Sequence, residues 1–396
     1  MFDRLLGIFA FLSPRNDDDL ADRLSYFYSS TLLLLCAILL SIKQFGGRPL
    51  ECWMDASFPQ GWEDYAEMYC WAENTYYVPI SQDIPMSVAN RRRAEISYYQ
   101  WVPFFLALQA FAFYLPCILW RLMSQKSGFR MSHVISRARE KEMVETKHRE
   151  RITAELAKYF ASVLTNQQCA KKESLHRVLR CFNMRYSRFY MTVLYLCCKL
   201  LYTANCFGQF VAINTFLGAR TNTTTSLYGY HVVKDLLAGR GWQDSGAFPR
   251  VTLCDFSIRV LGQVQRHSVQ CVLVINIWTE KVFLLLWLWF LLVLCVSAFS
   301  LLYWALLMLL PVNHHTFLAR HLPPGSGSRS ARRRFASRFL RADGIFVLRM
   351  ISTHLDPMFC SDVIRLLWEH FLDAKNLSNH PQGNPLNHQL LSSAPV

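Results

Sequence analysis

Four long apolar stretches, separated by polar segments, dominate the pattern of the chain. Residues 24–42, 96–120, 200–219 and 282–313 contain no Asp, Glu, Lys or Arg. A helix needs about 20 apolar residues to cross roughly 30 Å of hydrocarbon, whereas surface helices of soluble proteins keep a polar face. The pattern therefore predicts an all-α membrane protein with four transmembrane helices.

These stretches divide the chain into nine segments. In chain order we expect an N-terminal segment (1–23), a first span (24–43), a first loop (44–95), a second span (96–122), a middle loop (123–188), a third span (189–219), a second loop (220–280), a fourth span (281–311) and a tail (312–396). The middle loop and the tail are long enough to fold into helices of their own.

The distribution of charge orients the spans. Basic residues outnumber acidic ones by 16 to 6 over residues 121–188 and by 10 to 5 from residue 312 onward, whereas the first loop carries a net charge of −4. Lys and Arg accumulate on the cytoplasmic side of membrane proteins. We therefore expect the middle loop and both termini inside the cell and the other two loops outside. The second loop, with a net charge of +3 over residues 220–279, fits less well, but loops of about 60 residues obey the rule poorly.

Composition agrees with a membrane protein and excludes other classes. The chain is 52% hydrophobic and 18% charged, against roughly 25% charged residues in soluble domains. Its net charge of +14 lies where the topology requires it, so nucleic acid is not expected as a partner. The sequence contains no HExxH motif, no phosphate-binding loop and no GxSxG motif, so neither an enzyme nor a cofactor is expected.

The topology places four of the 13 cysteines outside the cell, namely Cys52, Cys70, Cys254 and Cys271. An even number of cysteines in an oxidising compartment predicts two disulfides. Their separations do not match the close spacing of zinc ligands, so no metal site is expected. Four cysteines allow three pairings, and spacing alone does not choose among them.

The N-terminal segment carries two open alternatives. Apolar residues with helical spacing, including Phe2 and Leu5, predict a short amphipathic helix. This helix either lies on the membrane surface or has a more specific role in the protein. The run Asp17, Asp18 and Asp19 is either a ring of negative charge at a pore entrance or a solvated group before the first helix.

Other residues have a functional and a structural reading. Pro103 either bends the second span or sits in its first turn, where proline is tolerated. Lys199 is either functional within the membrane or, as we expect, reaches the headgroups.

Three features outside the spans are further candidates. His314 and His315 are expected to be solvated on a loop rather than to sense pH. Asn222 begins a glycosylation sequon. The basic run from Arg332 to Arg334 is a candidate contact for anionic lipid.

Several motifs resemble those of the innexins, the invertebrate gap-junction proteins. The most specific is the signature at the mouth of the second span, formed by Tyr98, Tyr99, Gln100, Trp101, Val102 and Pro103. Motifs around Asp19–Leu24, both outer cysteine pairs, Asn276–Lys281 and Asp343–Phe346 are similar to innexin motifs as well. The resemblance runs from about residue 16 to residue 351.

The resemblance implies a function. It implies a subunit of a ring, octameric in this family, in which identical or related subunits surround a pore for ions and small molecules at the plasma membrane. A ring docks through its outer loops with a ring in the adjoining cell, or acts alone as a hemichannel. The resemblance also implies the pairs Cys52–Cys271 and Cys70–Cys254. It favours a pore funnel formed by the N-terminal segment, with Phe2, Asp3, Arg4 and Leu5 among its residues.

Two rivals remain. One is a channel of the same architecture that never docks, which a glycan at Asn222 would favour because it obstructs the outer rim. The other is a four-span adhesion or scaffold protein such as a claudin or tetraspanin, although the Cys-Cys-Gly pattern of tetraspanins is absent from the outer loops.

Overall fold

A computed structural model of the chain describes residues 18–55, 60–79, 82–125, 146–173, 189–218, 248–323, 328–355 and 357–379, together with positions 58, 135, 234 and 325. The chain forms two compact units. The first contains Leu20–Cys117 and Lys199–Ser300, and the second contains Pro14–Asp19, Ile118–Cys198 and Leu301–Val396.

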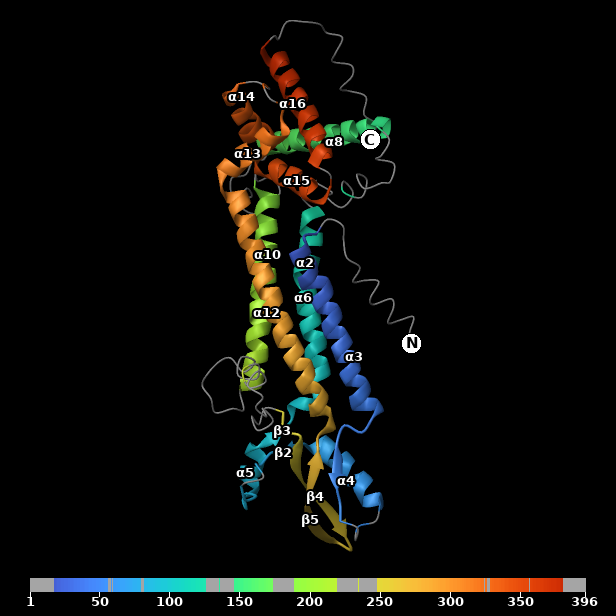
Figure 1. The fold of residues 1–396 in the computed structure, drawn as a ribbon. Coiled ribbons are helices and arrows are strands. Elements are labelled where there is room, and N and C mark those ends of the chain that lie inside the picture. The colour runs from blue at the N-terminus through green and yellow to red at the C-terminus, as the bar shows by residue number, and fades with distance from the viewer. Residues whose placement is uncertain are drawn as a thin grey trace. The chain divides into compact units, whose positions relative to one another are not determined.

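Four helices are long and apolar enough to cross a membrane (Figure 1). The first is continuous over Leu20–Gly46 and is built from α2 (Leu20–Arg23), a π-helical segment η1 (Leu24–Ser29) and α3 (Ser30–Gly46). The other three are α6 (Val102–Ser124), α10 (Tyr190–Gly218) and α12 (Val274–Leu309). These four helices confirm the predicted fold class.

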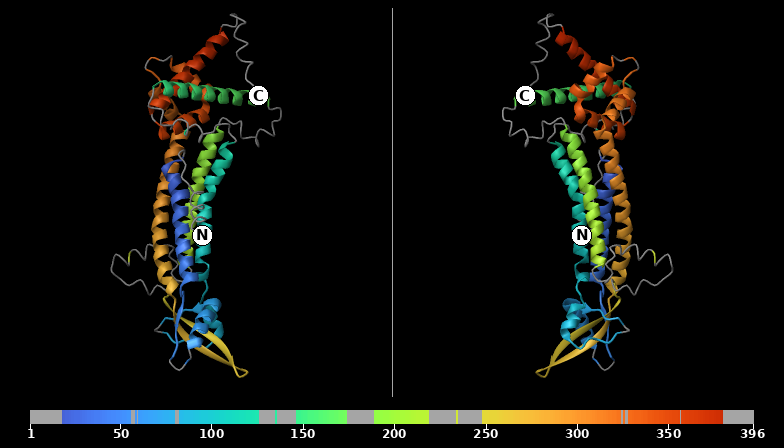
Figure 2. Two further views of the ribbon diagram at one scale, coloured as in Figure 1. Left: turned by 90° about the vertical axis from the view of Figure 1, so that its right-hand side faces the viewer. Right: turned by 90° about the vertical axis from the view of Figure 1, so that its left-hand side faces the viewer.

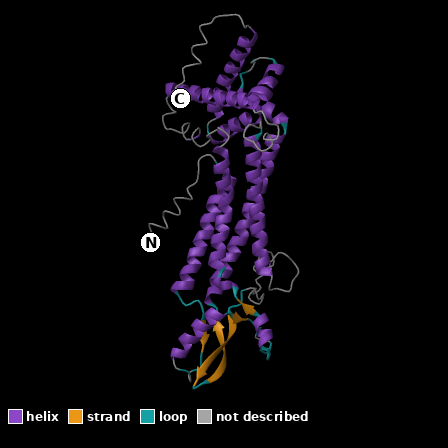
Figure 3. Cartoon of the chain, turned by 180° about the vertical axis from the view of Figure 1, so that it is seen from behind, coloured by secondary structure: helices purple, strands orange, loops and turns teal. Residues whose placement is uncertain are grey.

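The loops of the first unit contain a five-stranded sheet that the expectation of an all-α protein did not include. Strands β1 (Glu51–Trp53), β2 (Thr75–Tyr76), β3 (Glu95–Ile96), β4 (Val251–Val260) and β5 (Gln263–Val272) pair antiparallel in the order β1-β5-β4-β2-β3. Figure 3 shows these strands gathered at one end of the apolar helices. The sheet interleaves strands from both loops, so the two loops form one folded body.

Three short helices flank this sheet: α4 (Gln60–Glu73), α5 (Val88–Arg93) and the 3₁₀ turn η2 (Tyr98–Gln100). On β4 the side chains of Thr252, Cys254 and Phe256 are buried and alternate with more exposed neighbours. Such alternation is the pattern of a strand with one buried face.

The second unit is helical. It contains α8 (Thr146–Glu173), α13 (Pro311–His321), α14 (Arg329–Arg334), the π-helical η7 (Phe335–Leu340), α15 (Arg341–His354) and α16 (Pro357–Asn379). Nine consecutive residues of α15, Asp343 to Ile351, are buried. Large side chains such as Phe160, Phe335 and Phe346 form the core around it.

Candidate functional site

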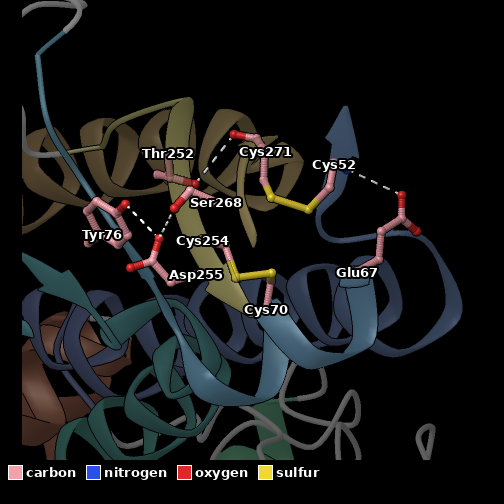
Figure 4. Close-up of a disulfide and its surroundings, with 9 residues drawn as sticks. All are labelled: Cys52, Glu67, Cys70, Tyr76, Thr252, Cys254, Asp255, Ser268 and Cys271. Atoms are coloured by element: carbon pink, nitrogen blue, oxygen red, sulfur yellow. Dashed lines mark hydrogen bonds between the residues drawn. A yellow bond between two sulfur atoms is a disulfide. The ribbon is translucent and has the colours of Figure 1, made fainter. Parts of the chain in front are cut away.

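Two disulfides join the first loop to the second. Cys52 of β1 is bonded to Cys271 of β5, and Cys70 of α4 is bonded to Cys254 of β4 (Figure 4). This is the pairing that the family resemblance implied. The bonds connect residues 219 and 184 positions apart, so they hold together segments that the chain itself leaves far from each other.

The sulfurs of Cys52, Cys70 and Cys271 lie within 4.8 Å of one another, close enough for thiolates to share a metal ion. All three are oxidised in disulfides, however, and metal binding by cysteine requires the thiolate. The cluster therefore acts as a crosslink.

A polar network around Asp255 adds a second connection between the loops. Its carboxylate accepts hydrogen bonds from Tyr76 Oη at 3.0 Å, from Ser268 Oγ at 2.6 Å and from Arg91 Nη1 at 2.7 Å. Burial raises the pKa of Asp255, but the three donors and the Arg91 charge outweigh it and bring the pKa below its ordinary value. Burial and the neighbouring Asp255 raise the pKa of Tyr76 to about 12.

Replacing Asp255 by asparagine should loosen this connection. The amide keeps one acceptor but leaves the mostly buried Arg91 without its counter-charge, so we expect a loss of about 1–3 kcal/mol in the stability of the loops. Faster proteolysis of the loops on intact cells would show the loss. Ser268→Ala removes one neutral donor and should cost less. Unchanged proteolysis of the Asp255 variant would contradict the prediction.

Acidification should act on the same carboxylate. Because its pKa in the folded protein is lowered, the stability from Asp255 is fully present above the ordinary value of 3.8 and is lost as pH falls through the folded value.

The aromatic signature lies where the first span, the first loop and α6 meet. Tyr99 is fully buried and its ring lies 4.8 Å from that of Trp71, measured between centroids. Gln100 donates to the backbone oxygen of Trp71, and Gln44 at the end of α3 donates to the backbone oxygen of Gln100. The signature thus ties loop backbone to two helices.

Pro103 is the second residue of α6, so the first-turn reading holds. The interior proline of this helix is Pro116, which sequence reasoning missed. A proline at this position removes the hydrogen bond to the carbonyl four residues earlier. The sequence indicates it only by a proline in the middle of an apolar run.

Several polar side chains of the first span bond to another helix. Lys199 Nζ of α10 lies 2.9 Å from Asp22 Oδ1 and donates to Ser300 Oγ of α12 at 2.7 Å. The side chains of Lys199 and Asp22 are only 2% and 9% exposed. The prediction that Lys199 reaches the headgroups is therefore wrong. Asp22 and Ser300 bind its ammonium group inside the helical bundle, so the side chain does not need to extend to the headgroups.

More polar contacts follow along η1 and the start of α3. Ser25 Oγ lies 3.2 Å from Ser297 Oγ, Trp289 Nε1 donates to Ser29 Oγ at 2.9 Å, and Ser30 Oγ donates to the backbone oxygen of Ala110 at 2.8 Å. Buried polar groups in a membrane are costly unless they are paired. These bonds therefore fix the rotation of the first span against α6 and α12.

Two of the three clustered aspartates lie within the described residues. Asp18 is buried, and Asp19 accepts a hydrogen bond from Trp304 Nε1 at 3.1 Å. Asp18 is therefore not solvated, and Asp19 is hydrogen-bonded to α12, while a ring of charge at a pore entrance stays a prediction. Asp17, the funnel residues Phe2, Asp3, Arg4 and Leu5, and the sequon residue Asn222 lie outside the described residues.

In the second unit, Asp343 binds the start of α10. Its Oδ1 accepts from both the backbone nitrogen and Oγ1 of Thr192, each at 3.1 Å. A carboxylate there bonds free backbone N–H groups and faces the positive end of the helix dipole. Burial nevertheless raises the pKa of Asp343 to about 6, against the lowering effect of these hydrogen bonds.

This raised pKa predicts a pH dependence of stability. The folded protein binds the proton more tightly than the unfolded chain, so the contribution of Asp343 is fully present below its ordinary pKa of 3.8 and is lost as pH rises through about 6. Asp343→Asn should abolish this slope in the unfolding temperature of detergent-solubilised protein between pH 4 and 7. Glu369→Gln, an exposed change on α16, should keep it. An unchanged slope in Asp343→Asn would refute the assignment.

His314 and His315 lie in helix α13 rather than on a loop, which corrects the expectation. Burial, together with the nearby charge of Arg349, lowers the pKa of the half-buried His314. His315 is exposed. The basic run from Arg332 to Arg334 forms the end of α14, with Arg333 and Arg334 exposed.

The comparisons with known proteins agree with this architecture. The family model described as Innexin matches residues 18–371, nearly the whole described chain. The chain belongs to the innexin family. Innexins form gap-junction channels built of related subunits, and the chain fits a multi-pass protein of the plasma membrane.

Among its innexin relatives, Innexin-11 of Caenorhabditis elegans is 39% identical over 405 residues, covering 98% of this chain and 86% of that protein. Innexin unc-9 of the same organism is 40% identical over 369 residues, covering 92% and 95%. Innexin-3, also from Caenorhabditis elegans, is 39% identical over 362 residues, covering 90% and 84%. This membership sets aside the claudin-like and tetraspanin-like reading.

Proposed function

We propose that the chain is a subunit of a gap-junction channel that passes ions and small molecules between adjoining cells. Copies of this chain or related innexins would form the ring, an octamer by family resemblance, and two rings would meet through their disulfide-linked loops. The proposed function requires no reaction substrate and no cofactor, because conduction needs only a pore of suitable width and charge.

The observation that carries the proposal is the single folded body made by the two loops. Disulfides form and persist in oxidising compartments, so Cys52–Cys271 and Cys70–Cys254 support an extracellular position for both loops. Four spans then leave both termini in the cytoplasm, in agreement with the basic middle loop and tail. A rigid outer body suits docking, since a preformed surface loses little entropy on binding.

The pore would be formed by side chains of the spans and by the N-terminal segment 1–23, folded inward as a funnel. Anionic and neutral lipids would surround the exposed apolar faces of the four helices. Asn222, close after the third span, is a candidate glycosylation site, and a shift on glycosidase treatment would show its use.

Paired-cell recording tests the proposal. Cells that express the chain should show junctional conductance and dye transfer when paired, and antibody against a terminal tag should bind only after permeabilisation. Dye uptake by single cells without transfer between pairs would instead favour the undocked hemichannel. Absence of any conductance, with the protein at the surface, would refute a channel function.

A further inference from the structure

The second unit carries a strongly basic helix surface on the continuous segment formed by α14 and η7. What we call the arginine face consists of four exposed arginines, Arg329, Arg333, Arg334 and Arg338. The other side of the segment is buried in the core of the unit through Ala331, Phe335 and Leu340. The four guanidinium groups are therefore carried by a packed helix with one fixed face toward solvent.

The π-helical part of this segment keeps the arginines together. Each residue of an α-helix turns by about 100°, so Arg338 would lie about 180° from Arg329 in an uninterrupted α-helix. A π-helix bonds residue i to residue i+5 and turns less per residue, which brings Arg338 back toward Arg333 and Arg334. The irregularity thus concentrates positive charge on one face, and π-helical turns are frequent at functional sites.

The arginine face has no counter-charge among the described residues. None of its four arginines forms an ion pair there. Asp343 of α15 is buried and accepts hydrogen bonds from Thr192. In α16, Asp362 Oδ2 lies 2.9 Å from Arg149 Nη2. Both carboxylates are therefore already paired with other groups.

The two remaining acidic residues of α16 point away from the arginine face. This helix packs on η7 through Phe371, whose ring centroid lies 5.4 Å from that of Phe335. Glu369 and Asp373 are each two positions from Phe371, which places them about 160° from it round the helix. Both are exposed. Since like charges on neighbouring turns repel each other, the arginine face is suited to an anionic partner.

The character of the surface favours a phosphorylated small molecule over a protein. Protein interfaces depend on buried aromatic and apolar anchors, but α14, η7 and α15 have no exposed large hydrophobic side chain among their described residues. Arginine binds phosphate through two parallel hydrogen bonds, and the exposed hydroxyl of Ser337 adds a donor. Four guanidinium groups on one face match a ligand with several phosphate groups.

The position of α14 within the second unit favours a dissolved ligand. Figure 2 shows α8 and the tail helices gathered at the ends of α10 and α12 that belong to this unit. In Figure 1, α14 lies farther from these ends than α13 and α15 do. Lipid headgroups would surround α10 and α12 where they enter the membrane. Anionic lipid, the candidate contact in the sequence, is therefore the less suitable ligand.

We propose that the arginine face binds a soluble molecule with several phosphate groups, of the class of inositol polyphosphates or nucleoside triphosphates. Neighbouring phosphates of such a ligand pair with several guanidinium groups at once. The site would give the tail a ligand of its own, in addition to conduction. Only its location in the cytosol rests on the proposed topology, because binding is measured on the purified protein.

Titration of the purified full chain with inositol hexakisphosphate tests the site. Calorimetry in detergent should show binding to the wild type, and the affinity should fall as salt is added, because exposed charges are screened. Arg333→Gln/Arg338→Gln removes two of the four guanidinium groups and should weaken binding by roughly tenfold or more. Both side chains are exposed, so the unfolding temperature should equal that of the wild type.

A matched control removes the same amount of charge elsewhere in the second unit. Lys158→Gln/Arg365→Gln replaces two exposed cations, one on α8 and one on α16, and should bind like the wild type. Nanodiscs distinguish a dissolved ligand from a lipid. The affinity for inositol hexakisphosphate should be the same in neutral nanodiscs and in nanodiscs that also contain phosphatidylinositol bisphosphate.

Four results would overturn the inference. The wild type could fail to bind, or Arg333→Gln/Arg338→Gln could bind as tightly as the wild type. An equal loss in Lys158→Gln/Arg365→Gln would show a general attraction to a basic protein instead of a site. Competition by phosphatidylinositol bisphosphate in the nanodisc would make a membrane lipid the ligand. A failure of coupling between cells would leave all these measurements unchanged, so it would be recognised separately.

Discussion

Replacing Lys199 by methionine is expected to remove most of the protein from the cell surface. The change leaves the carboxylate of Asp22, 9% exposed, without its counter-charge inside the helical bundle. Breaking a buried ion pair by removal of one partner costs about 3–5 kcal/mol, a large part of the 5–15 kcal/mol by which a typical protein is stable. Surface biotinylation and the unfolding temperature in detergent would measure the loss.

The double variant Asp22→Asn/Lys199→Met should recover most of this loss, because no uncompensated charge then remains. Lys43→Met is the matched control: Lys43 lies at the exposed end of α3, where its Nζ is 5.3 Å from the Trp278 ring, so its removal should cost no more than about 1 kcal/mol. If Lys199→Met behaves like Lys43→Met, or if the double variant is no better than the single one, the pair does not hold the bundle together.

The spans could be predicted because the bilayer imposes a one-dimensional rule. Any charge-free run of about 20 apolar residues satisfies it, whatever its neighbours. The same rule says nothing about a single charge at the margin of a run. Whether Lys199 turns to the headgroups or inward depends on Asp22, which is 177 positions away in the chain and becomes its neighbour only after folding.

The sheet of the loops shows a different limit. Thr252, Cys254 and Phe256 of β4 alternate with their neighbours in burial, but Thr252 is polar and Val251 and Leu253 are apolar, so the sequence does not show this pattern. Strands β2 and β3 contain only two residues each and carry no periodicity. Such strands form only by pairing with other parts of the fold: β2 pairs with β4, and β3 pairs with β2. In the tail, the family resemblance pointed to Asp343, yet only the structure shows its hydrogen bonds to Thr192 at the start of α10.

Removal of the Cys70–Cys254 bond is expected to abolish coupling between cells. The double change to serine avoids a lone thiol, and it releases α4 from β4, to which this bond is the covalent link. A native disulfide usually contributes about 2–5 kcal/mol. Removal of the Cys52–Cys271 bond should be milder, because Glu51, Cys52 and Trp53 of β1 remain paired with β5. Junctional conductance and protease sensitivity of the loops on intact cells would rank the two.

The test depends on which of the two disulfide variants loses more coupling, because any disruption of the loops weakens docking to some extent. The spans remain inserted without the bonds, so single rings of either variant should still reach the surface, and only the outer body should come apart. Cys295→Ser, an exposed free cysteine of α12, controls for the loss of a sulfur and should couple normally. Equal coupling by Cys70→Ser/Cys254→Ser and Cys295→Ser would mean that α4 keeps its place without the crosslink. A larger loss in the Cys52 and Cys271 pair would mean that the short strand β1, and not α4, limits the stability of the outer body.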